Sequence, residues 1–161
     1  MHAERTVLSL LIAAALLFVP CAAATGDTGS AGRIIVSPAD DRYDIAGLDN
    51  AIRSIGGWIY PGETDTITKN IPSGTKMICV RLDWSGHSHT GTDSVSLIIY
   101  PPDGGCYGPY LDNVDGTIDE KISLDISDSP SLPPGEWQFD VHGDSVPQEG
   151  DAYTLSAYLY S

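Results

Sequence analysis

The feature that most limits what this chain can fold into is a series of short segments in which apolar and polar residues alternate. In residues 77–84 (MICVRLDW) the apolar positions that share one face are Ile78, Val80, Leu82 and Trp84. The same alternation occurs in residues 65–71, 94–100, 121–126, 136–141 and 153–160. A period of two with one polar face is typical of antiparallel sheets that have one face in water. The pattern therefore predicts six strands.

The connections between these segments hold the residues that form tight turns. Residues 72–74 read PSG, residues 101–105 read PPDGG and residues 133–135 read PPG. Proline fixes φ at one turn position, and glycine adopts the left-handed conformation that another position needs. A helical spacing of apolar residues is closest to forming in residues 45–55, where we expect at most one or two helical turns. Short strands separated by such turns predict an all-β fold, an antiparallel β-sandwich of jelly-roll type.

The first residues are typical of an export signal rather than of a folded domain. Arg5 precedes an apolar run over residues 7–19, and three alanines follow at residues 22–24. These are the charged, apolar and cleavage regions of a secretory signal peptide, which we place at residues 1–24. The run of 13 residues is shorter than the roughly 20 that a membrane anchor needs. A lipoprotein signal would use Cys21, but a proline stands before it where a small residue is expected.

The net charge excludes one class of partner, and the signal peptide indicates the location. The chain carries 22 acidic and 8 basic residues, a formal net charge of −14. Such a surface repels phosphate backbones, so we expect no nucleic-acid partner, and no membrane contact after signal cleavage. We expect the mature protein outside the cell or in the cell envelope. Residues 25–57 are predicted to form a flexible leader with the first short strand or strands, and residues 58–161 the β-sandwich domain.

Removal of the signal peptide leaves two cysteines, Cys79 and Cys106, in a compartment where disulfides persist. Cys79 is in phase with Arg81 and Asp83, so it should point away from the core. An internal Cys79–Cys106 bond would close a loop of about 27 residues and stabilise the fold by ~3–4 kcal/mol. It requires the two Cα atoms to lie within ~7 Å of each other. The alternative is a pair of intermolecular bonds between neighbouring subunits.

Residues with catalytic or metal-binding chemistry are few. Histidines are scarce and no Gly-x-Ser-x-Gly motif is present, so we predict that the chain is not an enzyme. The best metal candidate is an acidic segment whose oxygens would suit Ca²⁺, although its spacing departs from that of an EF-hand. Its candidate ligands are Asp112, Asn113, Asp115, Asp119 and Glu120. Because Asp, Asn and Gly also form ordinary turns, a chain without any cofactor is the alternative.

Several tyrosines fall on the polar faces of predicted strands or in a glycine-rich loop. These interface candidates are Tyr100, Tyr107, Tyr110, Tyr158 and Tyr160. An aromatic ring with a polar tip suits a protein interface, and such rings also serve as stacking platforms for sugars. The tyrosines therefore indicate contacts with other copies of the chain or with a cell-surface glycan.

Five motifs follow one another along the predicted sandwich. They are PGETD at residues 61–65, VRLDW at 80–84, SLIIYPPDG at 96–104, LPPGEW at 132–137 and VHGDSV at 141–146. In this order they resemble the pre-peptidase C-terminal type of β-sandwich over about residues 58–160. The resemblance is closest to small secreted versions in methanogenic archaea, some of which are envelope or cell-sheath subunits. It implies a non-catalytic module, and the short segment before it favours a free-standing structural role.

Two functions are consistent with these observations. The first is a structural subunit of an extracellular layer or sheath, a homo-oligomer or polymer joined through strand edges and Tyr-bearing faces. Residues 153–160 contain no Lys or Pro that would protect an edge strand, so we expect an exposed edge there. The second is a Ca²⁺-assisted carbohydrate- or protein-binding module of the pre-peptidase C-terminal type.

Overall fold

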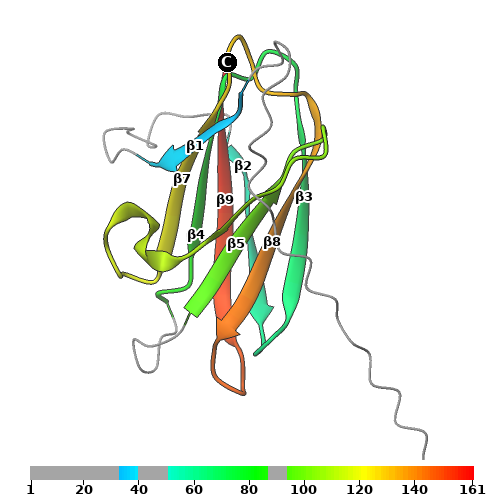
Figure 1. The fold of residues 1–161 in the computed structure, drawn as a ribbon. Coiled ribbons are helices and arrows are strands. Elements are labelled where there is room, and N and C mark those ends of the chain that lie inside the picture. The colour runs from blue at the N-terminus through cyan, green and yellow to red at the C-terminus, as the bar shows by residue number, and fades with distance from the viewer. Residues whose placement is uncertain (1–32, 40–50, 87–93) are drawn as a thin grey trace, which may run out of the picture.

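The chain folds into two antiparallel β-sheets packed face to face (Figure 1). A computed structural model describes residues 33–39, 51–86 and 94–161. The strands are β1 (Ile35–Pro38), β2 (Ala51–Ile59), β3 (Thr64–Ile71), β4 (Met77–Asp83), β5 (Ser94–Tyr100), β6 (Tyr107–Tyr110), β7 (Lys121–Ser127), β8 (Gly135–Ser145) and β9 (Asp151–Tyr160), with a short 3-10 helix, η2 (Asp112–Asp115). The first sheet has the strand order β1-β7-β4-β9-β2, and the second has the order β3-β8-β5-β6.

The strands pair in a nested way that defines the topology. β2 pairs with β9, β3 with β8, β4 with β7 and β5 with β6, so the outermost partners along the chain enclose the inner ones. Successive pairs fall alternately in the first and second sheet. This is the arrangement of a double-sheet jelly roll, to which β1 adds a further strand beside β7. The predicted β-sandwich of jelly-roll type is therefore confirmed.

Alternation along each strand fills the space between the two sheets. On β4 the side chains of Ile78, Val80 and Leu82 are fully buried, and the facing β8 contributes Trp137 and Phe139 to the same core. Fully burying a side chain of this size stabilises the fold by roughly 1.5–3 kcal/mol relative to exposure. The residues between them on each strand point to the outside of the sandwich. Burial of one face per strand therefore fixes the register of both sheets.

The six strands expected from alternation all form. β1 lies within residues 25–57, where the first short strand or strands were expected, β2 begins there and extends beyond it, and β6 was missed. Residues 51–59 form β2, so the expectation of helical turns within residues 45–55 is wrong for the part that the structure describes. The predicted domain boundary at residue 58 falls inside β2, and the sandwich includes β1 as well. The physical reason is that Gly56 and Gly57 remove two side chains from the alternating pattern, so β2 carries a weak strand signal.

Gly57 has a packing role that explains why a glycine occupies the inner face of β2. A Cβ at this position would overlap the phenol ring of Tyr153, its cross-strand neighbour on β9. The Tyr153 hydroxyl donates a hydrogen bond to Oδ2 of Asp65 on β3, in the opposite sheet. Burial and this hydrogen bond both raise the pKa of Tyr153 well above its ordinary value. The missing side chain thus makes room for a polar link between the two sheets.

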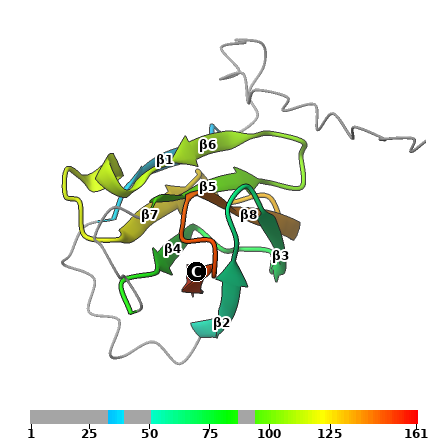
Figure 2. The same ribbon diagram turned by 90° about the horizontal axis from the view of Figure 1, so that it is seen from below.

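Four strands form the edges of the two sheets. Figure 2 shows β2 and β3 side by side at one margin of the sandwich, and β1 and β6 at the other. The expectation that residues 153–160 form an exposed edge is wrong, because β9 lies between β4 and β2 and pairs with both. Strand order depends on pairing between distant segments, so the local sequence could not reveal it.

The proposed signal peptide, residues 1–24, lies outside the residues that the structure describes. Within the ranges 33–39, 51–86 and 94–161, no helix has the length and the apolar character that crossing a membrane requires.

Candidate functional site

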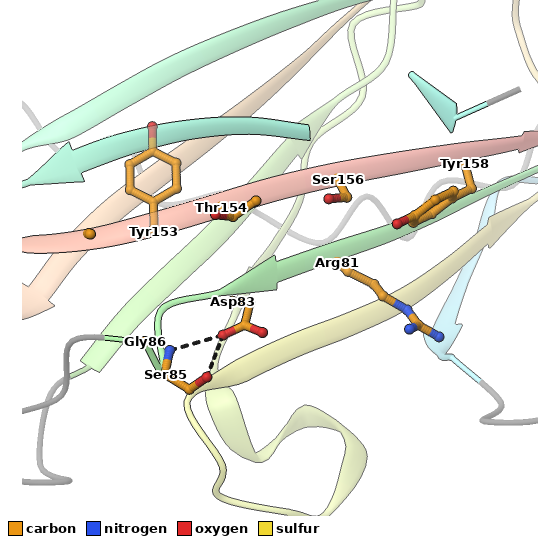
Figure 3. A pocket seen from close by; sticks show the side chains of 9 residues that line it. Arg81, Asp83, Ser85, Gly86, Tyr153, Thr154, Ser156 and Tyr158 are labelled. Atoms are coloured by element: carbon orange, nitrogen blue, oxygen red, sulfur yellow. Dashed lines mark hydrogen bonds between the residues drawn. The ribbon is translucent and has the colours of Figure 1, made fainter. Parts of the chain in front are cut away.

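The outer face of the five-stranded sheet carries a hollow of about 480 Å³ between β4 and β9 (Figure 3). We call it the outer hollow. Its lining consists of Arg81, Asp83, Ser85, Gly86, Ala152, Tyr153, Thr154, Ser156 and Tyr158. Most of these residues are charged, hydroxylated or aromatic. The outer hollow is therefore a polar site on an open sheet face, not a gap in the apolar core.

Strand alternation explains why these side chains gather outside the sandwich. Leu82 on β4 and Leu155 on β9 point into the core and pair directly with each other. Their neighbours Arg81 and Thr154 must therefore point outward. At the end of β4, Oδ1 of Asp83 accepts hydrogen bonds from the backbone N–H of Ser85 at 3.0 Å and from its hydroxyl at 2.7 Å. These two bonds fix the orientation of the Asp83 carboxylate.

Hydroxyl groups and one aromatic ring complete the floor of the outer hollow. Ser156 is 9% exposed, and its Oγ lies 2.6 Å from Oγ of Ser54 on β2. Tyr158 lies two residues further along β9, opposite Cys79 on β4. Figure 3 shows Tyr158 at one end of the lining and Asp83 with Ser85 toward the other. The site thus combines an aromatic ring, a carboxylate and a row of hydroxyls.

A buried polar group lies next to the outer hollow on β4 and β7. It consists of Cys79, Arg81 and Asp125; Cys79 is 0% exposed and Asp125 is 9% exposed. Burial, followed by the nearby Asp125 carboxylate, raises the pKa of the Cys79 thiol to about 11, and Arg81 opposes this shift. Among the described residues, the Arg81 Nε and Asp125 Oδ1 atoms are buried without a hydrogen-bond partner. Figure 3 shows Arg81 reaching from β4 toward β7.

The predicted disulfide between Cys79 and Cys106 is wrong, because Cys79 is a free thiol. Cys79 points to the outer face of the first sheet, whereas Cys106 lies between β5 and β6 of the second sheet. Stacked sheets lie ~10 Å apart, and this thickness separates the two residues by more than the ~7 Å that a disulfide tolerates between Cα atoms. The full burial of Cys79 also disfavours the intermolecular alternative.

The acidic segment around η2 is organised by one of its own carboxylates. Asp112 accepts hydrogen bonds from the backbone N–H groups of Asp119 at 3.0 Å, Glu120 at 3.1 Å and Lys121 at 3.3 Å. Asp115 accepts one from the backbone N–H of Thr117 at 2.8 Å. Within the described residues, no three His, Cys, Asp or Glu side chains gather as a metal site would require. Asp112 therefore organises this loop through its hydrogen bonds to the backbone. The described residues provide no converging set of carboxylates that would support the Ca²⁺ hypothesis, and Asn113 is a neighbour of Asp112 on η2.

The five candidate tyrosines do not form one cluster. Tyr158 and Tyr160 lie on the outer face of the first sheet, and Tyr100 lies on the outer face of the second. Tyr107 and Tyr110 on β6 pack against the hydrophobic core. Only Tyr158 lines the outer hollow. The structure therefore divides the candidates between two opposite faces and the core.

His142 lies on the outer face of the second sheet, away from the outer hollow. Its Nδ1 is 2.8 Å from Oγ1 of Thr64, and its Nε2 is 3.9 Å from Oδ1 of Asp144. Both ring nitrogens thus face polar side chains on β3 and β8. The arrangement orients the imidazole on the outer face of the second sheet.

Sequence reasoning missed an exposed aromatic residue, Trp58, on the outer face of β2. Trp58 is 46% exposed, and its Nε1–H donates a hydrogen bond to the backbone carbonyl of Glu149 at 2.8 Å. A Cβ on Gly150 would overlap the indole, so the glycine allows the ring to lie against the β8–β9 turn. The sequence feature that could have indicated this residue is a Trp followed by an apolar residue, directly after Gly56 and Gly57.

Comparisons with known proteins give one kind of match. No protein-family description matches the sequence, and no curated protein is significantly similar to it. Among the solved structures that match is the crystal structure of Aeromonas hydrophila PliG, described as a periplasmic lysozyme inhibitor of g-type lysozyme. The TM-score is 0.44 and the sequence identity 15%, over 71% of this chain and 90% of that chain. What the outer hollow can bind must therefore be inferred from its own residues.

Proposed function

We propose that this protein is a non-catalytic structural protein of the cell envelope that associates with copies of itself through the free edge of β2. The signal-like N-terminus and the acidic composition favour a location outside the cell. The observation that carries the proposal is the character of β2 as an edge strand. The proposal replaces the expected edge at residues 153–160, which β9 cannot provide.

The other three edges carry features that oppose pairing with another chain. β1 and β6 are four residues long and contain Pro38 and Pro109, which cannot donate a ladder hydrogen bond. β3 is longer, but Asp65 and Lys69 share its inner face with Ile67, and inward-pointing charges disfavour sheet extension.

β2 lacks these features over most of its length. It has nine residues, contains no Lys or Pro, and among the strands that the structure describes it pairs only with β9. A bulge between Ile52 and Ile55 interrupts its first part, but the register from Ile55 to Ile59 is continuous. This stretch presents a row of backbone N–H and C=O groups to an incoming strand. Antiparallel pairing of β2 with β2 of a second copy would be isologous, so it closes as a dimer rather than growing into a filament.

The oligomeric state in solution tests this proposal. Gly56 points outward on β2, and a Cβ there would meet only the Tyr153 carbonyl oxygen, at 3.7 Å. Gly56→Lys therefore places a charge at the edge without a clash inside the fold. Thr68→Lys places the same charge on the exposed face of β3 and serves as the matched control.

We expect multi-angle light scattering with size-exclusion chromatography to give a dimer mass for the native chain at micromolar concentration. Gly56→Lys should weaken the dimer at least tenfold, whereas Thr68→Lys should leave it unchanged. A native chain that stays monomeric over the whole concentration range would overturn the proposal. Equal weakening by both variants would also overturn it, because general charge repulsion would then be the cause.

A second candidate is a carbohydrate- or protein-binding module, and the outer hollow is the observation that favours it. Its lining is polar and open to solvent, and it lies on a different surface from the β2 edge. This candidate no longer depends on Ca²⁺, because Asp112 uses its carboxylate to hold its own loop. Both candidates are non-catalytic, and blank peptidase, esterase and glycosidase assays are expected for the native chain.

A further inference from the structure

We infer that the outer face of the first sheet binds a neutral glycan chain that lies along β9 between Trp58 and Tyr158. The inference rests on the binding-module candidate and does not require association through β2. It joins three observations: the mixture of charges beside the outer hollow, the buried polar atoms without partners, and two aromatic side chains on one face.

The charges beside the outer hollow select against ionic ligands. Arg81 lies on β4 between Asp83 on the same strand and Asp125 on the neighbouring β7. A cation would be repelled by the guanidinium, and an anion would be repelled by the two carboxylates and by a protein of net charge −14. A hydroxyl group can accept a hydrogen bond from Arg81 and donate one to a carboxylate at the same time. Side-by-side charges of opposite sign therefore fit a neutral polyhydroxylated ligand.

The atoms without partners point to the same chemistry. Arg81 Nε is a donor and Asp125 Oδ1 is an acceptor, and both are buried without a hydrogen bond among the described residues. Unsatisfied buried groups of this kind usually receive a bound molecule or a water. The hydroxyls of Thr154 and Ser156 extend the same donor and acceptor capacity along β9. A sugar chain on this face would supply hydroxyls to Arg81, Thr154 and Ser156, which line the outer hollow.

Aromatic rings stand at the two ends of the proposed path. Trp58 pairs with Ala152, six residues before Tyr158 on β9, which places the two rings ~20 Å apart along the sheet. Trp58 is pre-oriented by its bond to Glu149 and by its packing over Gly150. Ring faces held in this way suit the apolar faces of sugar rings. The spacing accommodates several sugars, with the outer hollow between the two rings.

Isothermal titration calorimetry with defined oligosaccharides tests the inference. The probes are neutral hexasaccharides of glucose, mannose and N-acetylglucosamine, and an acidic oligouronate of the same length. We expect at least one neutral hexasaccharide to bind with a Kd below about 1 mM, and the oligouronate to bind at least tenfold more weakly. Failure of all three neutral probes, or tighter binding of the oligouronate, would overturn the inference.

Matched variants locate the binding site. Trp58→Ala and Tyr158→Ala should each weaken binding at least tenfold, whereas Tyr100→Ala removes a half-buried tyrosine from the opposite face and should leave binding unchanged. Tyr158→Leu keeps an apolar side chain over β4 and provides a folded variant if the alanine form does not fold. Equal losses in Tyr158→Leu and Tyr100→Ala would contradict the site. Repeating the titration of the native chain at protein concentrations above and below the dimer dissociation constant separates glycan binding from assembly, because the affinity for the glycan should be the same for the monomer and the dimer.

Discussion

The link between Tyr153 and Asp65 offers a direct test of how the two sheets are held together. Tyr153→Phe removes the hydroxyl that donates to Asp65 Oδ2 and keeps the buried ring over Gly57. Tyr153 is 2% exposed, so water cannot easily replace the lost donor. A hydrogen bond to a charged group contributes about 1.5–3 kcal/mol. We therefore expect Tyr153→Phe to lower the free energy of unfolding by about 2 kcal/mol at pH 7.

Urea unfolding followed by tryptophan fluorescence measures this change. The midpoint should fall while the m-value stays the same, because the surface exposed on unfolding is unchanged. For a domain of this size the loss corresponds to a decrease of about 6–8 °C in Tm. Tyr60→Phe alters a tyrosine that is 48% exposed and should change stability by less than about 0.5 kcal/mol. A cycle with Asp65→Ala should give a coupling energy of at least about 1 kcal/mol.

The same variant makes a second, independent prediction at alkaline pH. Burial and the hydrogen bond to Asp65 raise the pKa of Tyr153 in the folded state, while the unfolded tyrosine ionises near its ordinary value of 10.0. The unfolded state therefore loses its proton first, and native stability falls as pH rises above 10, by at most ~1.4 kcal/mol per pH unit. Tyr153→Phe should lose less stability over this interval. A pH 7 loss below about 0.5 kcal/mol together with parallel alkaline curves would refute the reasoning.

Two further predictions concern the Cys79 thiol and the Asp112 carboxylate. Because folding raises the pKa of Cys79 from 9.0 to about 11, the free energy of unfolding should fall by on the order of 2 kcal/mol between these pH values. In Cys79→Ala the urea midpoint should depend less on pH over this interval. Identical pH curves for the native protein and the variant would contradict the prediction. Asp112→Ala leaves three backbone N–H groups without their acceptor, so hydrogen exchange at Glu120 and Lys121 should accelerate at least tenfold, whereas Asp115→Ala should leave these two amides protected.

The strands could be predicted from the sequence wherever one face is buried and the other is polar. Residues 94–100 were expected as a strand and form β5 with the same bounds. Residues 77–84 and 153–160 differ from β4 and β9 only at their ends. The alternation predicts these strands well because a register shift of one residue would expose a whole apolar face to water. Local pattern and burial therefore carry the same information for these strands.

Two strands outside the six alternating segments, β2 and β6, show where local information fails. β2 contains Gly56 and Gly57, and the second glycine is required by the Tyr153 ring that lies across it. β6 contains Gly108 and Pro109, which typically indicate a turn. Both segments are strands because of neighbours far along the chain, β9 for one and β5 for the other. Pairing with distant segments overrides the turn signal that these residues carry on their own.

Cys79 illustrates why the candidate site could be predicted only in part. Cys79 alternates in step with Arg81, and this correctly places it on the outer face of the sheet. The alternation does not indicate how deeply the side chain is buried. β4 is the central strand of a five-stranded sheet, so Asp125 and Tyr158 flank Cys79 from both sides and bury it. The outer face of a wide sheet is thus polar by sequence and yet partly shielded from water at its centre. The neighbours that bury Cys79 include Asp125 and Arg81, and the sheet leaves one atom of each, Asp125 Oδ1 and Arg81 Nε, without a hydrogen-bond partner among the described residues. The number of partners that a polar group finds at this centre depends on the neighbouring strands, and the alternation of a single strand does not contain that information.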